Sequence, residues 1–115
     1  MTLYLPAYYA SLRRLQRGDL TARIASVGIG SGGEPEATEL TDPFVKPVTG
    51  LVDGEDPRTL LVTYAIAPGD APEGMVVREI GLLAADGTLL VRRRFTHGIE
   101  ITALSGLSGT FDLEV

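Results

Sequence analysis

Residues 75–95 read MVVREIGLLAADGTLLVRRRF, and this stretch decides the fold. Apolar and polar residues alternate on both sides of Asp86-Gly87, which is typical of two half-buried strands, Met75–Leu83 and Thr88–Phe95. An Asp-Gly pair suits the positive backbone dihedral angles of a type I′ turn. The two strands are therefore predicted to be antiparallel neighbours in a hairpin.

Charged residues interrupt both strands of this hairpin. In a regular strand Arg78 and Glu79 point to opposite faces and so cannot pair with each other. Alternation places Arg92 and Arg94 on one face and Arg93 on the other, so at least one guanidinium must pair with a carboxylate or lie at an interface. Two interpretations stay open for these arginines: a surface that meets a partner, or exposure on an edge strand where charge prevents aggregation.

Further strands are expected on both sides of the hairpin. Arg58–Ala67 is rich in Leu, Val, Thr, Tyr and Ile and lies between two turns, Asp53–Pro57 and Pro68–Asp70. At the end of the chain, Thr110–Val115 alternates three apolar residues directed inward with two acids directed outward. Weaker patterns predict three more strands, at Leu20–Ile29, Lys46–Val52 and Ile99–Ala103.

One short helix is predicted before the strands. Pro6 suits a first helical turn, Tyr8, Leu12 and Leu15 follow at helical spacing, and Gly18 can end the helix, so we place it at residues 6–17. Gly30–Pro47 and Gly98–Gly109 are read as long loops. The sequence thus predicts a single domain, residues 1–115, of a β-rich α+β class: a short N-terminal helix, then a mainly antiparallel sheet or small sandwich with long loops.

Composition excludes several classes of site. The 115 residues include no Cys and one His, which excludes disulfides, thiolate metal sites and thiol nucleophiles, and leaves no His-rich metal centre. A net charge of −5 argues against nucleic acid as the partner, and no apolar run is long enough for a membrane span. Residues 1–23 carry four arginines against one aspartate, whereas residues 34–73 carry nine acids against two bases. These opposite charges could attract neighbouring copies.

Two motifs with possible chemistry have plainer explanations. Gly28, Gly30 and Gly33 have the spacing of a dinucleotide-binding loop, but acidic residues follow at once and no helix pattern does, which favours a glycine turn. His97 and the serines at 105 and 108 lack the strand–turn–helix setting of a hydrolase nucleophile. We therefore predict no enzyme activity and no cofactor.

The segment Val77–Leu83, followed by Asp86–Leu90, resembles the amino-terminal domain of phage tail fibre proteins, the tail-collar fibre family, whose hallmark is a stretch of the form REIGL…DG. The upstream order is also similar, with a short helix, a strand at Ile24–Gly30, the pair Gly32-Gly33 and an acidic loop that contains Leu40. The chain departs from the family at Ile29, where relatives have an acid.

This resemblance implies a virion structural protein of a tailed phage or phage-tail-like particle, located at the tail or baseplate after synthesis in the host cytoplasm. Relatives continue into a fibre shaft where this sequence ends, so the expected role is to anchor or adapt fibres. The expected partners are other tail, baseplate or fibre proteins and further copies of the chain, with a trimer as first choice. The candidate interface residues are Arg78, Glu79, Arg92, Arg93, Arg94, Tyr8 and Tyr9.

A second class of function stays open, a small module that binds a carbohydrate or similar ligand. Tyr4, Tyr8 and Tyr9 could form an aromatic platform for a sugar. The competing interpretation is that Tyr8 packs into the core or into an interface between subunits.

Overall fold

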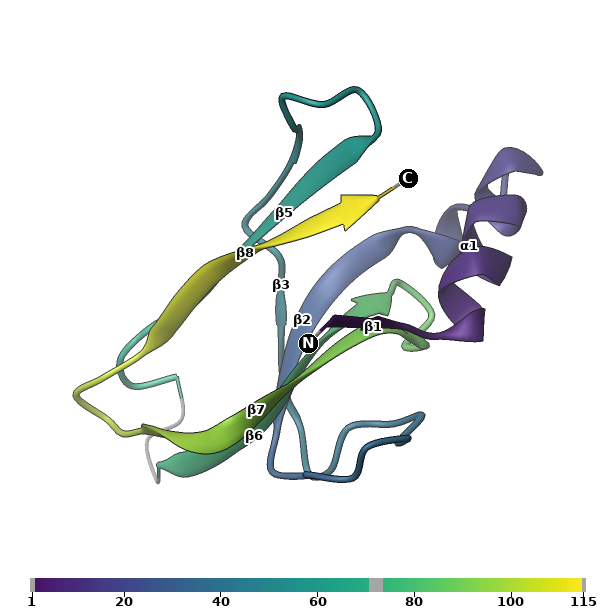
Figure 1. Cartoon of the computed structure of the whole chain (residues 1–115). Helices are drawn as coiled ribbons and strands as arrows, with labels where there is room; N and C mark the ends of the chain where they lie inside the picture. The colour runs from purple at the N-terminus through teal and green to yellow at the C-terminus, as the bar shows by residue number, and fades with distance from the viewer. Residues whose placement is uncertain (1, 71–73, 115) are drawn as a thin grey trace.

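Two antiparallel sheets and one helix make up the computed structural model, which describes residues 2–70 and 74–114 (Figure 1). The large sheet contains, in spatial order, β1 (Thr2–Tyr4), β7 (Leu89–Ile101), β6 (Met75–Ala84), β2 (Ile24–Gly30) and β3 (Phe44–Pro47). The small sheet contains β4 (Gly50–Asp53), β5 (Thr59–Ile66) and β8 (Leu107–Glu114). The predicted β-rich α+β class, with a short N-terminal helix and antiparallel strands, is confirmed.

The hairpin predicted from residues 75–95 is the central pair of the large sheet, β6 and β7. Its turn is not of type I′, because Gly87 has a positive φ of 91° whereas Asp86 does not. The amide of Gly87 donates to the carbonyl of Ala84, and the amide of Ala84 donates to the carbonyl of Thr88. This pattern is a three-residue loop with its glycine in the left-handed region, the other common solution for a tight hairpin.

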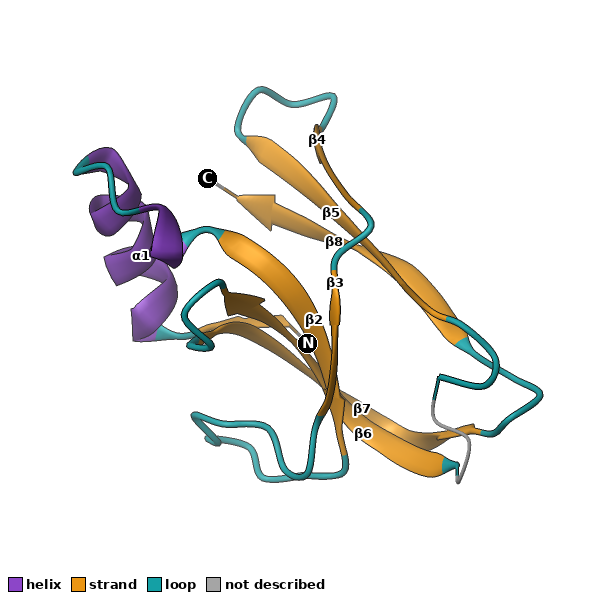
Figure 2. Cartoon of the chain, turned by 180° about the vertical axis from the view of Figure 1, so that it is seen from behind, coloured by secondary structure: helices purple, strands orange, loops and turns teal. Residues whose placement is uncertain are grey.

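The core lies between the apolar faces of the two sheets. From the small sheet, Val62, Phe111 and Leu113 are fully buried, and from the large sheet Ile29 and Ile80 meet them in the same cluster. The predicted inward direction of Phe111 and Leu113 is confirmed, and Val115 lies outside the described residues. Figure 2 shows the small sheet facing the large one at an angle, with the helix beside them at one end.

Helix α1 (Pro6–Gln16) agrees with the predicted range to within one residue and starts with proline in its first turn. Gly18, at a φ of 87°, ends it as expected. The next segment differs from the prediction: Leu20–Ala22 is a 3-10 turn, η1, and β2 begins only at Ile24. The cause is Asp19, whose side chain accepts a hydrogen bond from the amide of Thr21 and so caps the turn.

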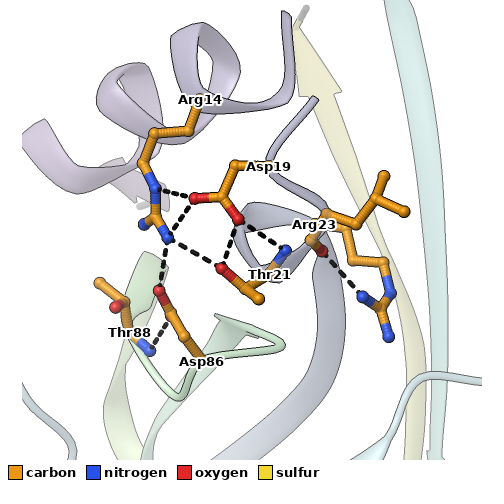
Figure 3. A network of polar contacts seen from close by, with 7 residues as sticks. Arg14, Asp19, Thr21, Arg23, Asp86 and Thr88 are labelled. Atoms are coloured by element: carbon orange, nitrogen blue, oxygen red, sulfur yellow. Dashed lines mark hydrogen bonds and ion pairs between the residues drawn. The ribbon is translucent and has the colours of Figure 1, made fainter. Parts of the chain in front are cut away.

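A polar network fixes this helix end to the tip of the central hairpin (Figure 3). The guanidinium of Arg14 lies 2.9 Å from carboxylate oxygens of both Asp19 and Asp86. Asp86 also accepts a hydrogen bond from the amide of Thr88, and these contacts, with those to Thr88 the largest, lower the pKa of its carboxyl from 3.8 to about 2. Residues 72 positions apart in the chain are thereby held together.

Two further sequence expectations were wrong. Lys46–Val52 is not one strand, because β3 ends at Pro47 and β4 begins at Gly50 in the other sheet. The predicted loop 30–47 likewise ends in a strand, β3, which pairs with β2. The short strand β1 had no signal in the sequence. The strand expected at Ile99–Ala103 is present in part, as the end of β7, which runs to Ile101, and β8 begins at Leu107, inside the segment that was read as a loop.

Candidate functional site

Glu79 and Arg92 form an ion pair inside the large sheet. Oε1 of Glu79 accepts a hydrogen bond of 2.8 Å from Nε of Arg92, and the two side chains are 0% and 1% exposed. Glu79 therefore pairs with a residue of the neighbouring strand and not with Arg78, as expected. A buried pair of this kind is strongly coupled, since removal of either partner leaves an uncompensated charge without water.

The second oxygen of Glu79 holds the segment 31–43, which we call the glycine loop. Oε2 accepts hydrogen bonds from the amide of Gly32, at 3.0 Å, and from the amide of Thr41, at 2.7 Å. Within the loop, the amide of Ser31 donates to the carbonyl of Thr41, which closes its base. One carboxylate thus fixes both ends of a segment that would otherwise leave its amides unpaired.

The glycine loop also packs on the outer face of the large sheet through Leu40. A Cβ placed on Gly28 would lie 2.6 Å from Cδ1 of Leu40, and one on Gly81 would lie 3.5 Å from Cδ2. The Leu40 side chain therefore occupies space that larger residues at these two positions would fill. The contact with Leu40 explains why a glycine stands at position 28, whereas at the facing position of β6 the tight contacts of Gly81 are with Leu89 and the backbone of Val91.

Beside the glycine loop lies a hollow of about 520 Å³, which we call the arginine hollow. It is lined by Leu3 of β1, Gly33 and Pro35 of the loop, Arg78 of β6, and Arg92, Arg94, Phe95 and Thr96 of β7. Arg78 and Arg94 are exposed, and neither has a carboxylate within 4 Å among the described residues. Arg94 donates one hydrogen bond, to the carbonyl of Gly33, so most of its donors face solvent.

Arg78 reaches the arginine hollow because β6 and β7 are not in regular register there. Val77 pairs with Ile99, but Glu79 pairs with Arg94, so β7 carries extra residues at this point. Because of this irregularity, Arg78 lines the same hollow as Arg92. In a regular strand Arg78 would point away from Glu79, and therefore also away from Arg92, which pairs with Glu79.

The three consecutive arginines have three different roles. Arg92 is buried in the ion pair, and Arg94 is exposed in the arginine hollow. Arg93 lies on the other face, as alternation predicts, where its guanidinium stacks 4.4 Å from the ring centre of Phe111 and donates to the hydroxyl of Thr2. Arg93 therefore connects the large sheet to β8 of the small sheet.

The tyrosines near the N-terminus form a cluster that is mostly internal. The rings of Tyr4 and Tyr8 lie 5.0 Å apart, and those of Tyr8 and Tyr9 lie 5.5 Å apart. Tyr8 is buried and its hydroxyl donates to the carbonyl of Glu114; burial, helped by the nearby Tyr4, raises its pKa to about 12. Tyr9 is 52% exposed and Tyr4 is half-buried, so the three tyrosines do not present one open aromatic surface of the kind that a sugar platform needs.

The remaining motif residues have structural places. Gly28 and Gly30 lie in β2, and the next element after Gly33 is β3 and not a helix. His97 is exposed in β7, and the hydroxyl of Ser105 accepts a hydrogen bond from the amide of Thr102. Within residues 2–70 and 74–114, no group of three or more metal-ligating side chains converges, and no helix has the length and apolar character to cross a bilayer.

The sequence therefore identified three of the residues at the arginine hollow, Arg78, Arg92 and Arg94. It missed Leu3, Gly33 and Pro35, which come from β1 and the glycine loop and are distant in the chain, and also Phe95 and Thr96, which directly follow Arg94 in β7. Of the other candidate residues, Glu79 and Tyr8 are internal, Arg93 lies between the sheets, and Tyr9 is on the surface.

Comparison with known proteins found no significant match to this chain. No model of a known protein family matches the chain, and neither a curated protein nor a solved structure is significantly similar to it.

Proposed function

We propose that this chain is a structural domain of a tailed phage or phage-tail-like particle, which anchors or adapts tail fibres at the tail end. Its function is to bind other tail, baseplate or fibre proteins. The resemblance of Val77–Leu83 and Asp86–Leu90 to the tail-collar fibre family is the starting point for this proposal.

The observation that carries the proposal is the double role of Glu79. This residue belongs to the REIGL stretch, and it binds Arg92 on one side and the glycine loop on the other. The motif residues therefore build a rigid support. A surface whose loop is fixed in advance loses little conformational entropy when it binds, which favours an attachment role.

The surface on that support has the character of a protein interface. Arg78 and Arg94 present charged donors, and Leu3, Phe95 and Pro35 add apolar contact area beside them. Arginine and aromatic residues are enriched at the centres of protein interfaces. The arginine hollow is therefore the surface through which we expect the chain to meet its partners.

The test is to locate the protein in particles. Tail particles are purified from the organism that encodes the chain and labelled with an antibody raised against the folded domain, and gold is mapped by electron microscopy. Gold at the tail end is expected, and particles from a strain without the gene serve as the control. If intact particles lack the protein, the proposed function is wrong.

A further inference from the structure

The described surface carries an acidic patch whose charge is opposite to that of the arginine hollow. The patch consists of Leu51, Val52, Asp53, Glu55 and Asp56, at the turn between β4 and β5. All three acids are exposed, and β4 is an edge strand of the small sheet. Leu51 and Val52 are 47% and 53% exposed, which is high for apolar residues on an edge strand, and they point to opposite faces of β4, with Leu51 bordering the depression beside α1.

The charges of the two surfaces balance. In the arginine hollow, Glu79 neutralises Arg92, which leaves two positive charges, on Arg78 and Arg94. In the acidic patch, the ion pair between Asp56 and Arg58, at 3.9 Å, leaves two negative charges, on Asp53 and Glu55. Each surface also has apolar neighbours, since Leu3 at the hollow is 43% exposed.

One chain cannot bring its own two surfaces together. The β4–β5 turn lies at one end of the molecule in Figures 1 and 2, and the glycine loop, which forms a wall of the arginine hollow, lies at the other end. Glu34 and Glu36 of the glycine loop line an adjoining depression that shares Pro35 with the hollow, and neither acid lies within 4 Å of Arg78 or Arg94 in an ion pair among the described residues. The partner for the hollow must come from outside the chain.

We propose that the arginine hollow of one copy binds the acidic patch of a second copy, so that copies of the chain associate head to tail. Asp53 and Glu55 pair with Arg78 and Arg94. Contacts between two different surfaces of identical chains close into a ring when the rotation between copies permits it. The inference rests on the proposed function and deepens it, because it names the surfaces that assemble the attachment unit.

The experiment is sedimentation equilibrium of the purified chain and four variants in about 50 mM salt. The wild-type chain is expected to form an oligomer. Both R78E/R94E and D53R/E55R place like charges together and are expected to raise the dissociation constant by at least about 10-fold. The combined variant R78E/R94E/D53R/E55R reverses both surfaces, so oligomers are expected to return. R13E/R17E changes the charge as much as R78E/R94E does but on exposed residues of the α1 end, and it should associate as the wild type does.

Several outcomes would overturn the inference. They are a wild-type chain that stays monomeric, hollow or patch variants that associate as the wild type does, or a combined variant that stays dissociated although circular dichroism shows that it is folded. In about 500 mM salt the wild-type association should weaken, because exposed charge pairs are screened. A chain that is found in tails but is monomeric in solution contradicts only this inference, whereas a chain that oligomerises but is missing from particles contradicts only the proposed function.

Discussion

Glu79 of β6 and Arg92 of β7 lie 2.8 Å apart in a buried ion pair, and the same glutamate accepts the amides of Gly32 and Thr41. A single carboxylate thus connects the central hairpin to the glycine loop, across 47 and 38 positions of sequence. The central hairpin and the glycine loop, which forms a wall of the arginine hollow, are therefore held together by the same side chain.

Replacement of Glu79 by Gln should destabilise the fold strongly. The Gln side chain has no charge to offset Arg92, and it cannot accept from all three donors that Glu79 binds. Loss of one partner of a buried pair costs about 3 to 5 kcal/mol, so the free energy of unfolding measured in urea should fall by that amount.

Hydrogen exchange gives a second readout for the same variant. The amides of Gly32 and Thr41 should exchange faster in E79Q, whereas the amide of Val62, in the small sheet, should change only as much as global stability does. Equal acceleration at all three amides would mean that Glu79 does not hold the loop specifically.

The strands and the helix could be predicted where a local signal exists, whereas the site could be predicted only in part. The alternation around Asp86-Gly87 predicted the hairpin, because that periodicity arises from the pleat itself. The three arginines illustrate the limit of this signal. Alternation predicts that Arg93 lies on the other face of the sheet, but it does not predict that Arg92 is buried and Arg94 exposed. That difference depends on Glu79 of the neighbouring strand β6, which pairs with Arg92, and on the glycine loop, which comes from a distant part of the chain.

The close packing around Gly81 predicts a position-specific effect of a single methyl group. A Cβ at Gly81 would lie 2.5 Å from Cδ1 of Leu89 and 2.9 Å from the backbone oxygen of Val91, so G81A must displace a strand as well as a side chain. Overpacking of this kind costs about 1 to 3 kcal/mol.

Gly33 provides the matched control for this prediction. Nothing lies within 4 Å of a Cβ at Gly33, and its φ is not positive, so G33A should change stability by no more than about 0.5 kcal/mol. Thermal unfolding of both variants is the measurement. Similar melting temperatures for G81A and the wild type would show that the hairpin can shift to accommodate the methyl group without loss of stability.

The network of Figure 3 predicts a stability change in acid. Because the folded-state pKa of Asp86 is lowered to about 2, its contribution is fully present above the unfolded value, near 3.9, and is lost as the pH falls from about 4 through about 2. Melting temperatures of the wild type and D86N should therefore differ by a constant amount at pH 5–7 and converge towards pH 2. A difference that stays constant over the whole range would exclude Asp86 as the titrating group.

The raised pKa of Tyr8 predicts a loss of stability at high pH. Its phenol is neutral in the fold up to a pKa of about 12, above the ordinary value of 10.0, so the stability it contributes is present below pH 10 and is lost as the pH rises towards 12. In an ultraviolet titration of the four tyrosines, the absorbance step at the highest pH should disappear in Y8F. If Y8F instead removes a step near pH 10, the phenol is accessible to water.

The position of Arg93 predicts that its guanidinium stabilises the packing of the two sheets. Its guanidinium stacks on Phe111 and donates to Thr2, so R93M should keep the apolar stem but lose both polar contacts, at a cost of about 1 kcal/mol. The control is R13M, which removes an exposed arginine of α1 and should change stability by no more than about 0.5 kcal/mol. Urea unfolding at high salt separates the two effects from any association of copies. Equal stability of R93M and R13M would mean that apolar packing alone holds β8 against the large sheet.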